Sequence, residues 1–77
     1  MIPSRQHIDY PYFTVLVKFK GDSQWYPQFG DEEKDIAQEE AQAFREDGHR
    51  TKIITTEFND QDAVFHAVVR INAGYSL

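Results

Sequence analysis

The chain has 77 residues, of which 40% are hydrophobic and 27% charged, which is typical of one globular domain and excludes a disordered segment. It contains no cysteine, which excludes disulfides, thiolate zinc sites and a cysteine nucleophile and suits a reducing compartment. A net charge of −5 opposes general association with nucleic acid or anionic membranes, and no apolar run has the length of a membrane span. We therefore expect a cytoplasmic protein without a membrane segment.

The N-terminal part of the chain predicts a leader followed by a β-hairpin. Residues 1–11 mix prolines and polar residues without periodicity, which predicts a flexible leader before a single domain at 12–77. From 12 to 20, every second residue is apolar, as in a strand. A Gly-Asp-Ser turn follows, and a second alternating segment at 24–29 completes the hairpin. Pro27 lacks the amide hydrogen of a central strand, so this second strand is expected at a sheet edge.

The rest of the chain predicts a helix, a strand and a second helix. Asp31 is a good N-cap for the first helix, and Gly48 is a typical residue for its end. The β-branched segment 50–58 predicts the third strand. Asn59 is expected to cap a second helix, which has apolar residues at helical spacing and ends near Gly74.

These elements predict an α+β fold in the order β-β-α-β-α, a three-stranded sheet with two helices packed on one face. The first strand is expected at the centre, because its apolar alternation is the clearest. One shared core is expected to contain Phe13, Val15, Val17, Phe19, Trp25, Phe44, Ile54, Val64, Val68 and Ile71. The opposite face of the sheet would then be open to solvent.

The sequence contains no motif for catalysis, and we predict that the protein is not an enzyme. His7, His49 and His66 lie in no triad or nucleophile-elbow context, although a site assembled from distant residues stays open. The acidic residues around 31–35 are explained by the positive end of a helix dipole. The glycines are isolated, so no phosphate-binding loop is present. We predict no catalytic, cofactor or metal-binding residues.

Three surfaces are candidates for binding. The first combines an aromatic loop, whose residue types are favoured at interfaces, with an acidic helix that suits a basic partner. Its predicted partner-binding residues are Trp25, Tyr26, Phe29, Glu32, Glu33, Glu39 and Glu40. The second is the flank of the last helix, where Phe65 and Val69 widen the apolar arc and predict either burial under a loop or self-association. The third is the open sheet face, where Tyr26 with Lys18 and Lys20 could bind single-stranded nucleic acid.

The segment KFKGDSQWYPQFGD, the acidic helix after it and the segment EDGHRTKIITTE resemble small bacteriophage and prophage proteins of uncharacterised function. The resemblance covers most of residues 12–73 and carries no site residues. It implies that the chain acts by binding a host protein, including host defence machinery. The segment FREDGHRTKII also resembles the helix-to-strand step of peptidoglycan-binding SPOR domains, but the strand order and count differ, and we treat this likeness as coincidence.

The leading hypothesis is therefore a phage-encoded, protein-binding modulator or inhibitor of a host defence or nucleic-acid-processing factor with a basic or mixed surface. A homodimer is a separate expectation. The alternative is a single-stranded nucleic-acid-binding protein that uses the open sheet face, although the acidic net charge weighs against nucleic acid.

Overall fold

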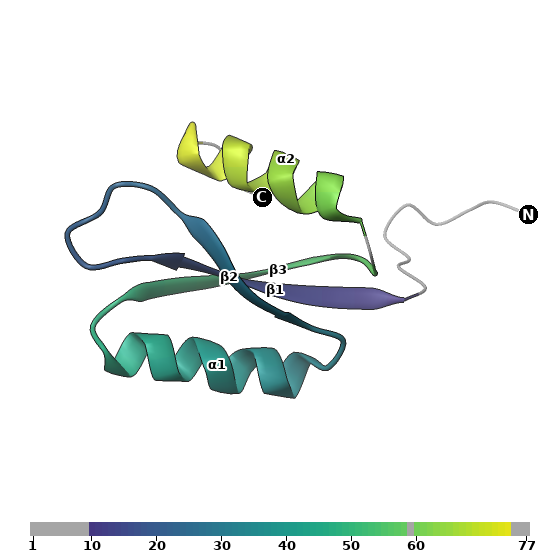
Figure 1. Ribbon diagram of the computed structural model, residues 1–77, viewed down its shortest axis with the longest axis horizontal. Helices are drawn as coiled ribbons and strands as arrows, with labels where there is room; N and C mark the ends of the chain where they lie inside the picture. The colour runs from purple at the N-terminus through teal and green to yellow at the C-terminus, as the bar shows by residue number, and fades with distance from the viewer. Residues whose placement is uncertain (1–9, 59, 75–77) are drawn as a thin grey trace, which may run out of the picture.

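The computed structural model describes residues 10–58 and 60–74. Its elements in chain order are β1 (Pro11–Lys18), β2 (Tyr26–Asp31), α1 (Lys34–Glu46), β3 (Arg50–Glu57) and α2 (Gln61–Asn72). The strands form one antiparallel sheet in the order β2-β1-β3 (Figure 1). This confirms the α+β class, the order of the elements, the central first strand and the edge position of Pro27. Residues 1–9 of the predicted leader lie outside the described residues, and β1 begins at Pro11.

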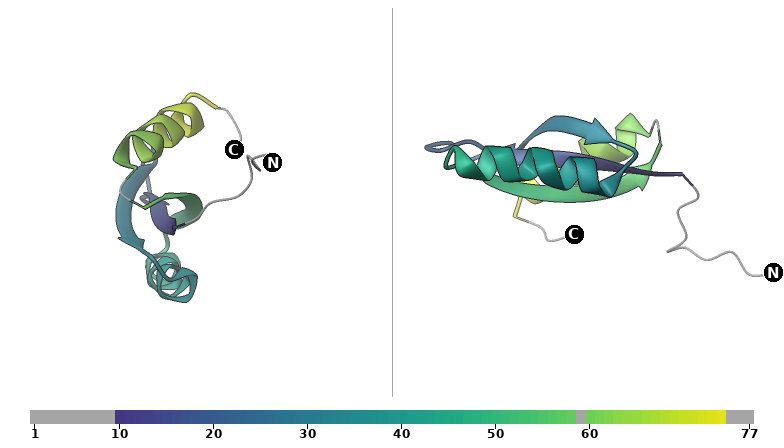
Figure 2. Two further views of the ribbon diagram at one scale, coloured as in Figure 1. Left: turned by 90° about the vertical axis from the view of Figure 1, so that its right-hand side faces the viewer. Right: turned by 90° about the horizontal axis from the view of Figure 1, so that it is seen from below.

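The two helices lie on opposite faces of the sheet, so the prediction that both pack on one face is wrong. Figures 1 and 2 show α1 against one face and α2 against the other. The reason lies in β1, where the consecutive residues 14–17 are all buried. Successive side chains of a strand point to opposite faces. A strand buried at consecutive positions must therefore be covered on both sides.

Two hydrophobic clusters replace the single predicted core. The cluster on the α1 side is built on Val15, Val17, Ala37 and Ala41, with Phe13, Phe19, Phe29, Phe44 and Ile53 packed around it. The cluster on the α2 side is built on Leu16, Ile54, Val64 and Ile71, with Trp25, Ala67 and Val68 packed around it. Because the adjacent residues Ile53 and Ile54 belong to different clusters, β3, like β1, contributes to both faces.

A β-bulge in β2 changes which side chains share a face. Val15 pairs with Phe29 and Leu16 pairs with Pro27, which leaves Gln28 as an extra residue. Tyr26 pairs with Val17, so Tyr26 and Phe29 are both on the α1 face, although simple alternation would separate them.

The start of β2 is anchored to the end of α2 by the side chain of Asn72. The Trp25 backbone N–H donates to Asn72 Oδ1 at 2.7 Å, and Asn72 Nδ2 donates to the Trp25 carbonyl oxygen at 3.2 Å. At its other end, α2 is capped by Asp60, whose Oδ1 accepts from the Ala63 N–H at 3.0 Å. The cap is therefore one residue later than predicted, and Asn59 lies outside the described residues. These contacts fix both ends of α2.

Candidate functional site

The aromatic segment around β2 does not form one loop surface. Trp25 is half-buried, packs against the α2-side cluster and lies 5.5 Å from Lys52 Nζ, measured to the ring centroid. Phe29 is half-buried in the α1-side cluster. Only Tyr26 is substantially exposed, at 43% of its surface, with its ring centroid 6.5 Å from that of Phe19. Of the three predicted aromatic anchors, the structure therefore presents Tyr26 to a partner.

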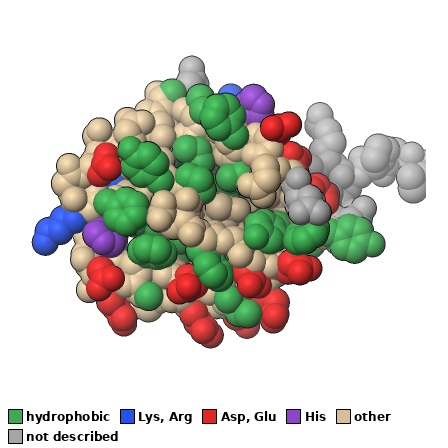
Figure 3. All heavy atoms as spheres, in the orientation of Figure 1, with side chains coloured by type: hydrophobic (Ala, Val, Ile, Leu, Met, Phe, Trp, Pro, Cys, Tyr) green, Lys and Arg blue, Asp and Glu red, His purple; other side chains and the backbone are tan. Residues whose placement is uncertain are grey.

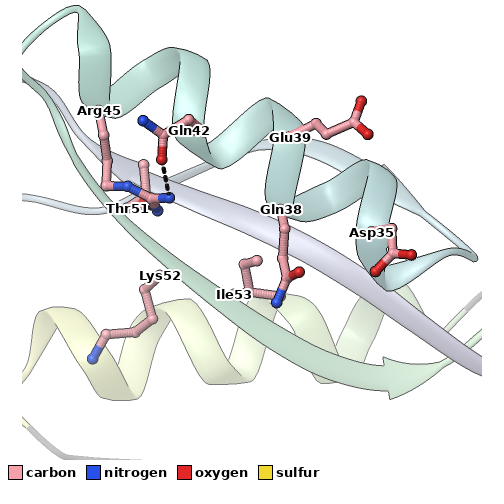
Figure 4. A pocket seen from close by; sticks show the side chains of 8 residues that line it. All are labelled: Asp35, Gln38, Glu39, Gln42, Arg45, Thr51, Lys52 and Ile53. Atoms are coloured by element: carbon pink, nitrogen blue, oxygen red, sulfur yellow. Dashed lines mark hydrogen bonds between the residues drawn. The ribbon is translucent and has the colours of Figure 1, made fainter.

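The acidic residues of α1 and the turn before it divide between two flanks of the helix. Glu32 and Glu33 are exposed in the turn, where the Glu33 N–H donates to Asp31 Oδ1 at 2.8 Å. Glu39 lines a groove between α1 and β3 (Figure 4). Glu40 is half-buried and lies about 100° further round the helix, on the flank toward β2. The predicted acidic ridge is thus two separate sets of carboxylates.

Two apolar side chains of α2 are more exposed than any aromatic side chain of β2. Phe65 is 64% exposed and Val69 is 48% exposed. Gln61 lines a groove with residues of β2, and Asn72 bonds to Trp25. Helical spacing places Phe65 between Gln61 and Asn72 on the same stripe, so this flank of α2 faces the β2 edge. The structure therefore brings Phe65 and Val69 to the side of the molecule that also carries exposed Tyr26.

We name this surface the β2-side face and define it by Tyr26, Pro27, Phe65 and Val69, all of them exposed. Figure 3 views the molecule from the side on which β2 forms the sheet edge, and hydrophobic side chains gather there between the two helices. Acidic side chains line the margin formed by α1 in the same view. An apolar centre with a charged rim is the usual organisation of a protein-binding surface.

The open sheet face required for nucleic-acid binding is absent from the described structure, so the surface predicted for that alternative is wrong. Leu16, expected on that face, is fully buried beneath α2. Tyr26 and Lys18 lie on opposite faces, because Tyr26 pairs with Val17, the neighbour of Lys18. Lys20 lies beyond the end of β1, where its backbone N–H donates to His49 Nδ1 at 3.0 Å. The three residues do not form one surface.

The groove between α1 and β3 is polar and has opposite charges at its two ends. Arg45 donates from Nη1 to Thr51 Oγ1 and from Nη2 to Gln42 Oε1, both at 2.8 Å. Figure 4 shows Arg45 at one end of the groove and Asp35 at the other, with Gln38 and Gln42 between them. Sequence analysis missed this groove, because only the tertiary packing of α1 on β3 brings these residues together.

A second groove, between β3 and α2, is more apolar. Its lining includes Ile54, Thr56 and Ala67, together with Lys52. Thr56 Oγ1 is buried and has no hydrogen-bond partner among the described residues. The feature of the sequence that relates to both grooves is the long, β-branched segment of the third strand. This segment forms β3, a sheet edge with a helix on either side, and each groove lies between β3 and one of these helices.

The histidines in the described part of the chain have ordinary surroundings. The His49 ring packs edge-on against Phe19 with centroids 4.9 Å apart, while exposed His66 contacts Phe65. No three His, Asp or Glu side chains among residues 10–58 and 60–74 are grouped so that they could hold a metal ion. Neither described helix is both long enough and apolar enough to cross a membrane. His7 lies outside the described residues.

The fold and the surface define a small α+β domain, with a helix on each face of a three-stranded sheet and an exposed apolar face along one edge. Comparison with protein-family models, curated proteins and solved structures finds no match.

Proposed function

We propose that this protein is a non-enzymatic binding module that docks a protein partner through the β2-side face. The observation that carries the proposal is the exposure of Phe65 and Val69 on α2 and of Tyr26 on β2, the edge strand that α2 contacts. A chain of this size has little apolar area to spare outside its own core. Large aromatic side chains at the centre of such a face are the usual source of binding energy.

The rim of the face favours a basic partner. Glu32 and Glu33 are exposed at the margin where α1 begins, and Glu40 lies on the same flank of that helix. Carboxylates around an apolar centre mainly raise the rate of association with a basic partner and determine which partners bind, and they add less to the affinity itself. The resemblance to bacteriophage products supports a host protein as the partner, such as a defence or nucleic-acid-processing factor in the host cytoplasm.

Affinity capture from bacterial lysate, compared between two matched variants, tests the apolar centre. The double change Phe65→Ser and Val69→Ser is expected to abolish retention of a defined partner, because both side chains are surface-exposed rather than core residues. His66→Ser, an exposed change on another flank of the same helix, is expected to leave retention unchanged. Equal retention by both variants would refute the assignment of this face.

Charge reversal tests the rim separately. Glu32→Lys with Glu33→Lys is expected to weaken capture and to reduce its dependence on salt, because exposed charges are screened. Glu46→Lys with Asp47→Lys, at the other end of α1, is the control with the same change in net charge. Trp25→Ala is unsuitable as a test of this face, because Trp25 packs against the α2-side cluster.

A further inference from the structure

We propose that the groove between β2 and the start of α2 receives an arginine side chain of the partner protein. The inference rests on the proposed docking function and deepens it, because the groove adjoins the β2-side face. Pro27 belongs to both, and Phe65 lies one helical turn after Gln61, which lines the groove. A partner segment docked on Phe65 can therefore place a side chain in the groove.

The floor of the groove contains a buried hydroxyl group. Thr14 is only 5% exposed and lines the groove. It points to the α2 face of the sheet, because it pairs with Ile54 of the α2-side cluster. Its side chain makes no hydrogen bond to another residue in the part of the chain that the structure describes. Valine has the same shape and no hydroxyl to satisfy, so the needs of folding alone do not explain a threonine here.

A second hydroxyl group borders the same groove. Gly30 pairs with Thr14 on the neighbouring strand, and a Cβ atom at Gly30 would lie 2.6 Å from Tyr12 Oη. Tyr12 is two residues from Thr14 in β1, so both side chains point to the same face. The absence of a side chain at Gly30 leaves room for the Tyr12 ring beside Thr14. Two hydroxyl oxygens that can accept hydrogen bonds therefore line one groove.

The remaining lining suits a long side chain with a hydrogen-bonding end. Val64 and Pro27 supply apolar contact, and the amide groups of the exposed residues Gln28 and Gln61 lie at the margin. The groove has a volume of about 290 Å³. Pockets for small molecules usually have volumes of about 300 to 1,000 Å³. The groove is therefore better matched to one side chain of a partner than to a whole small-molecule ligand.

The chain segments that frame the groove are acidic. Residues 31–33 lie at the end of β2, and residues 60–62 form the cap and the start of α2. These segments contain no Lys or Arg and have the carboxylates of Asp31, Glu32, Glu33, Asp60 and Asp62. The nearby Lys34 begins α1, on the other face of the sheet. Figure 3 shows acidic side chains at this end of the molecule. The surroundings therefore favour a cationic group and disfavour a phosphate or a carboxylate.

Arginine fits these features better than lysine. The possible acceptors are distributed over three elements, with the hydroxyls of Tyr12 and Thr14 on β1, the amide of Gln28 on β2 and the amide of Gln61 on α2. A guanidinium group is planar and carries five N–H donors, so it can reach several of these acceptors at once. A lysine ammonium group is compact and strongly hydrated, so it reaches fewer of them and loses more on leaving water.

Titration with three blocked pentapeptides tests the groove. Each peptide has glycines on both sides of one central residue, which is arginine, lysine or citrulline, and citrulline keeps the length of arginine without its charge. The amide NMR signals of Thr14, Gly30 and Gln61 are expected to shift saturably with the arginine peptide. The other two peptides are expected to bind at least about tenfold more weakly. Equal binding of all three peptides would overturn the assignment to arginine.

Matched threonine variants test the buried hydroxyl. Thr14→Val is expected to weaken binding of the arginine peptide about tenfold, because it removes a hydrogen bond to a charged group and keeps the side-chain shape. Thr14→Ser keeps the hydroxyl and is expected to bind like the unchanged chain. Thr55→Val makes the same change at an exposed position of β3 and is the control. The thermal midpoint of each variant separates loss of binding from loss of folding.

Charge neutralisation gives a second test that leaves the buried residues intact. Glu33→Gln with Asp62→Asn is expected to weaken binding of the arginine peptide several-fold and to reduce its dependence on salt, because exposed charges are screened. Glu46→Gln with Asp47→Asn removes the same charge at the other end of α1 and is expected to leave binding unchanged. An equal effect of the two double variants would show that only net charge matters and would overturn the local site.

The other possible occupants give distinct results. Shifts of the groove signals that grow with protein concentration in the absence of peptide would assign the groove to a second copy. Peptide binding that appears only after Arg5→Ser would assign it to the chain's own N-terminal segment. Either result, or no saturable shift with the arginine peptide, would overturn the proposal. Partner capture that is lost with Phe65→Ser and Val69→Ser would still support the docking function, so the two proposals fail separately.

Discussion

The contact between Asn72 and Trp25 gives a quantitative test of how α2 is held on the sheet. Asn72→Ala removes both hydrogen bonds, the 2.7 Å bond from the Trp25 N–H and the 3.2 Å bond to its carbonyl oxygen. Each such bond contributes about 0.5 to 1.5 kcal/mol, so the expected loss is about 1 to 3 kcal/mol. A domain of this size has a free energy of unfolding of roughly 4 to 12 kcal/mol. The substitution is therefore expected to lower the urea midpoint clearly.

Trp25 is the only tryptophan, so its fluorescence reports on the same contact. Release of its backbone from Asn72 is expected to loosen its ring from the α2-side cluster and move its emission to longer wavelength before global unfolding. Gln24→Ala is the matched control, because it removes an exposed amide beside Trp25 that bonds only locally, to the Ser23 carbonyl oxygen. If Asn72→Ala stayed within about 0.5 kcal/mol of this control with unchanged emission, the anchoring role of Asn72 would be refuted.

Two further substitutions test local features of the fold. Gly30→Ala is expected to cost about 1 to 3 kcal/mol, because the new Cβ would lie 2.5 Å from Tyr12 Cε2, whose ring packs edge-on against Phe58. Thermal unfolding of Gly30→Ala in a Tyr12→Ala background should show a smaller loss, and strict additivity would contradict the steric explanation. Asp60→Ala is expected to cost about 1 kcal/mol by removing the cap of α2, whereas Asp60→Asn should retain most of the stability. Equal denaturation midpoints for these two variants would show that the cap contributes nothing.

Local patterns were sufficient to predict the elements and part of the topology. The alternation in β1 and the proline in β2 correctly placed one strand at the centre and the other at an edge. The faces could not be assigned in the same way, because the bulge at Gln28 carries no sequence signal of its own and reverses the alternation of the residues around it. For this reason Trp25 and Phe29, which simple alternation would place on one face, lie on opposite faces.

The two-sided burial of the sheet did have a sequence signal. Val15, Leu16 and Val17 form a continuous apolar run, and Ile53 and Ile54 are adjacent apolar residues in β3. Such runs are typical of strands covered on both faces, whereas strict alternation is typical of strands covered on one. Phe65 and Val69 were recognised as extra apolar surface, but whether a loop covers them depends on tertiary packing, and the structure leaves both exposed.

Because a helix covers each face of the sheet, a partner can bind only at the edges of the sheet or on the exposed flanks of the two helices. On the β2 side, Pro27 disfavours pairing through the main chain, so a partner would have to dock through side chains such as Phe65 and Tyr26.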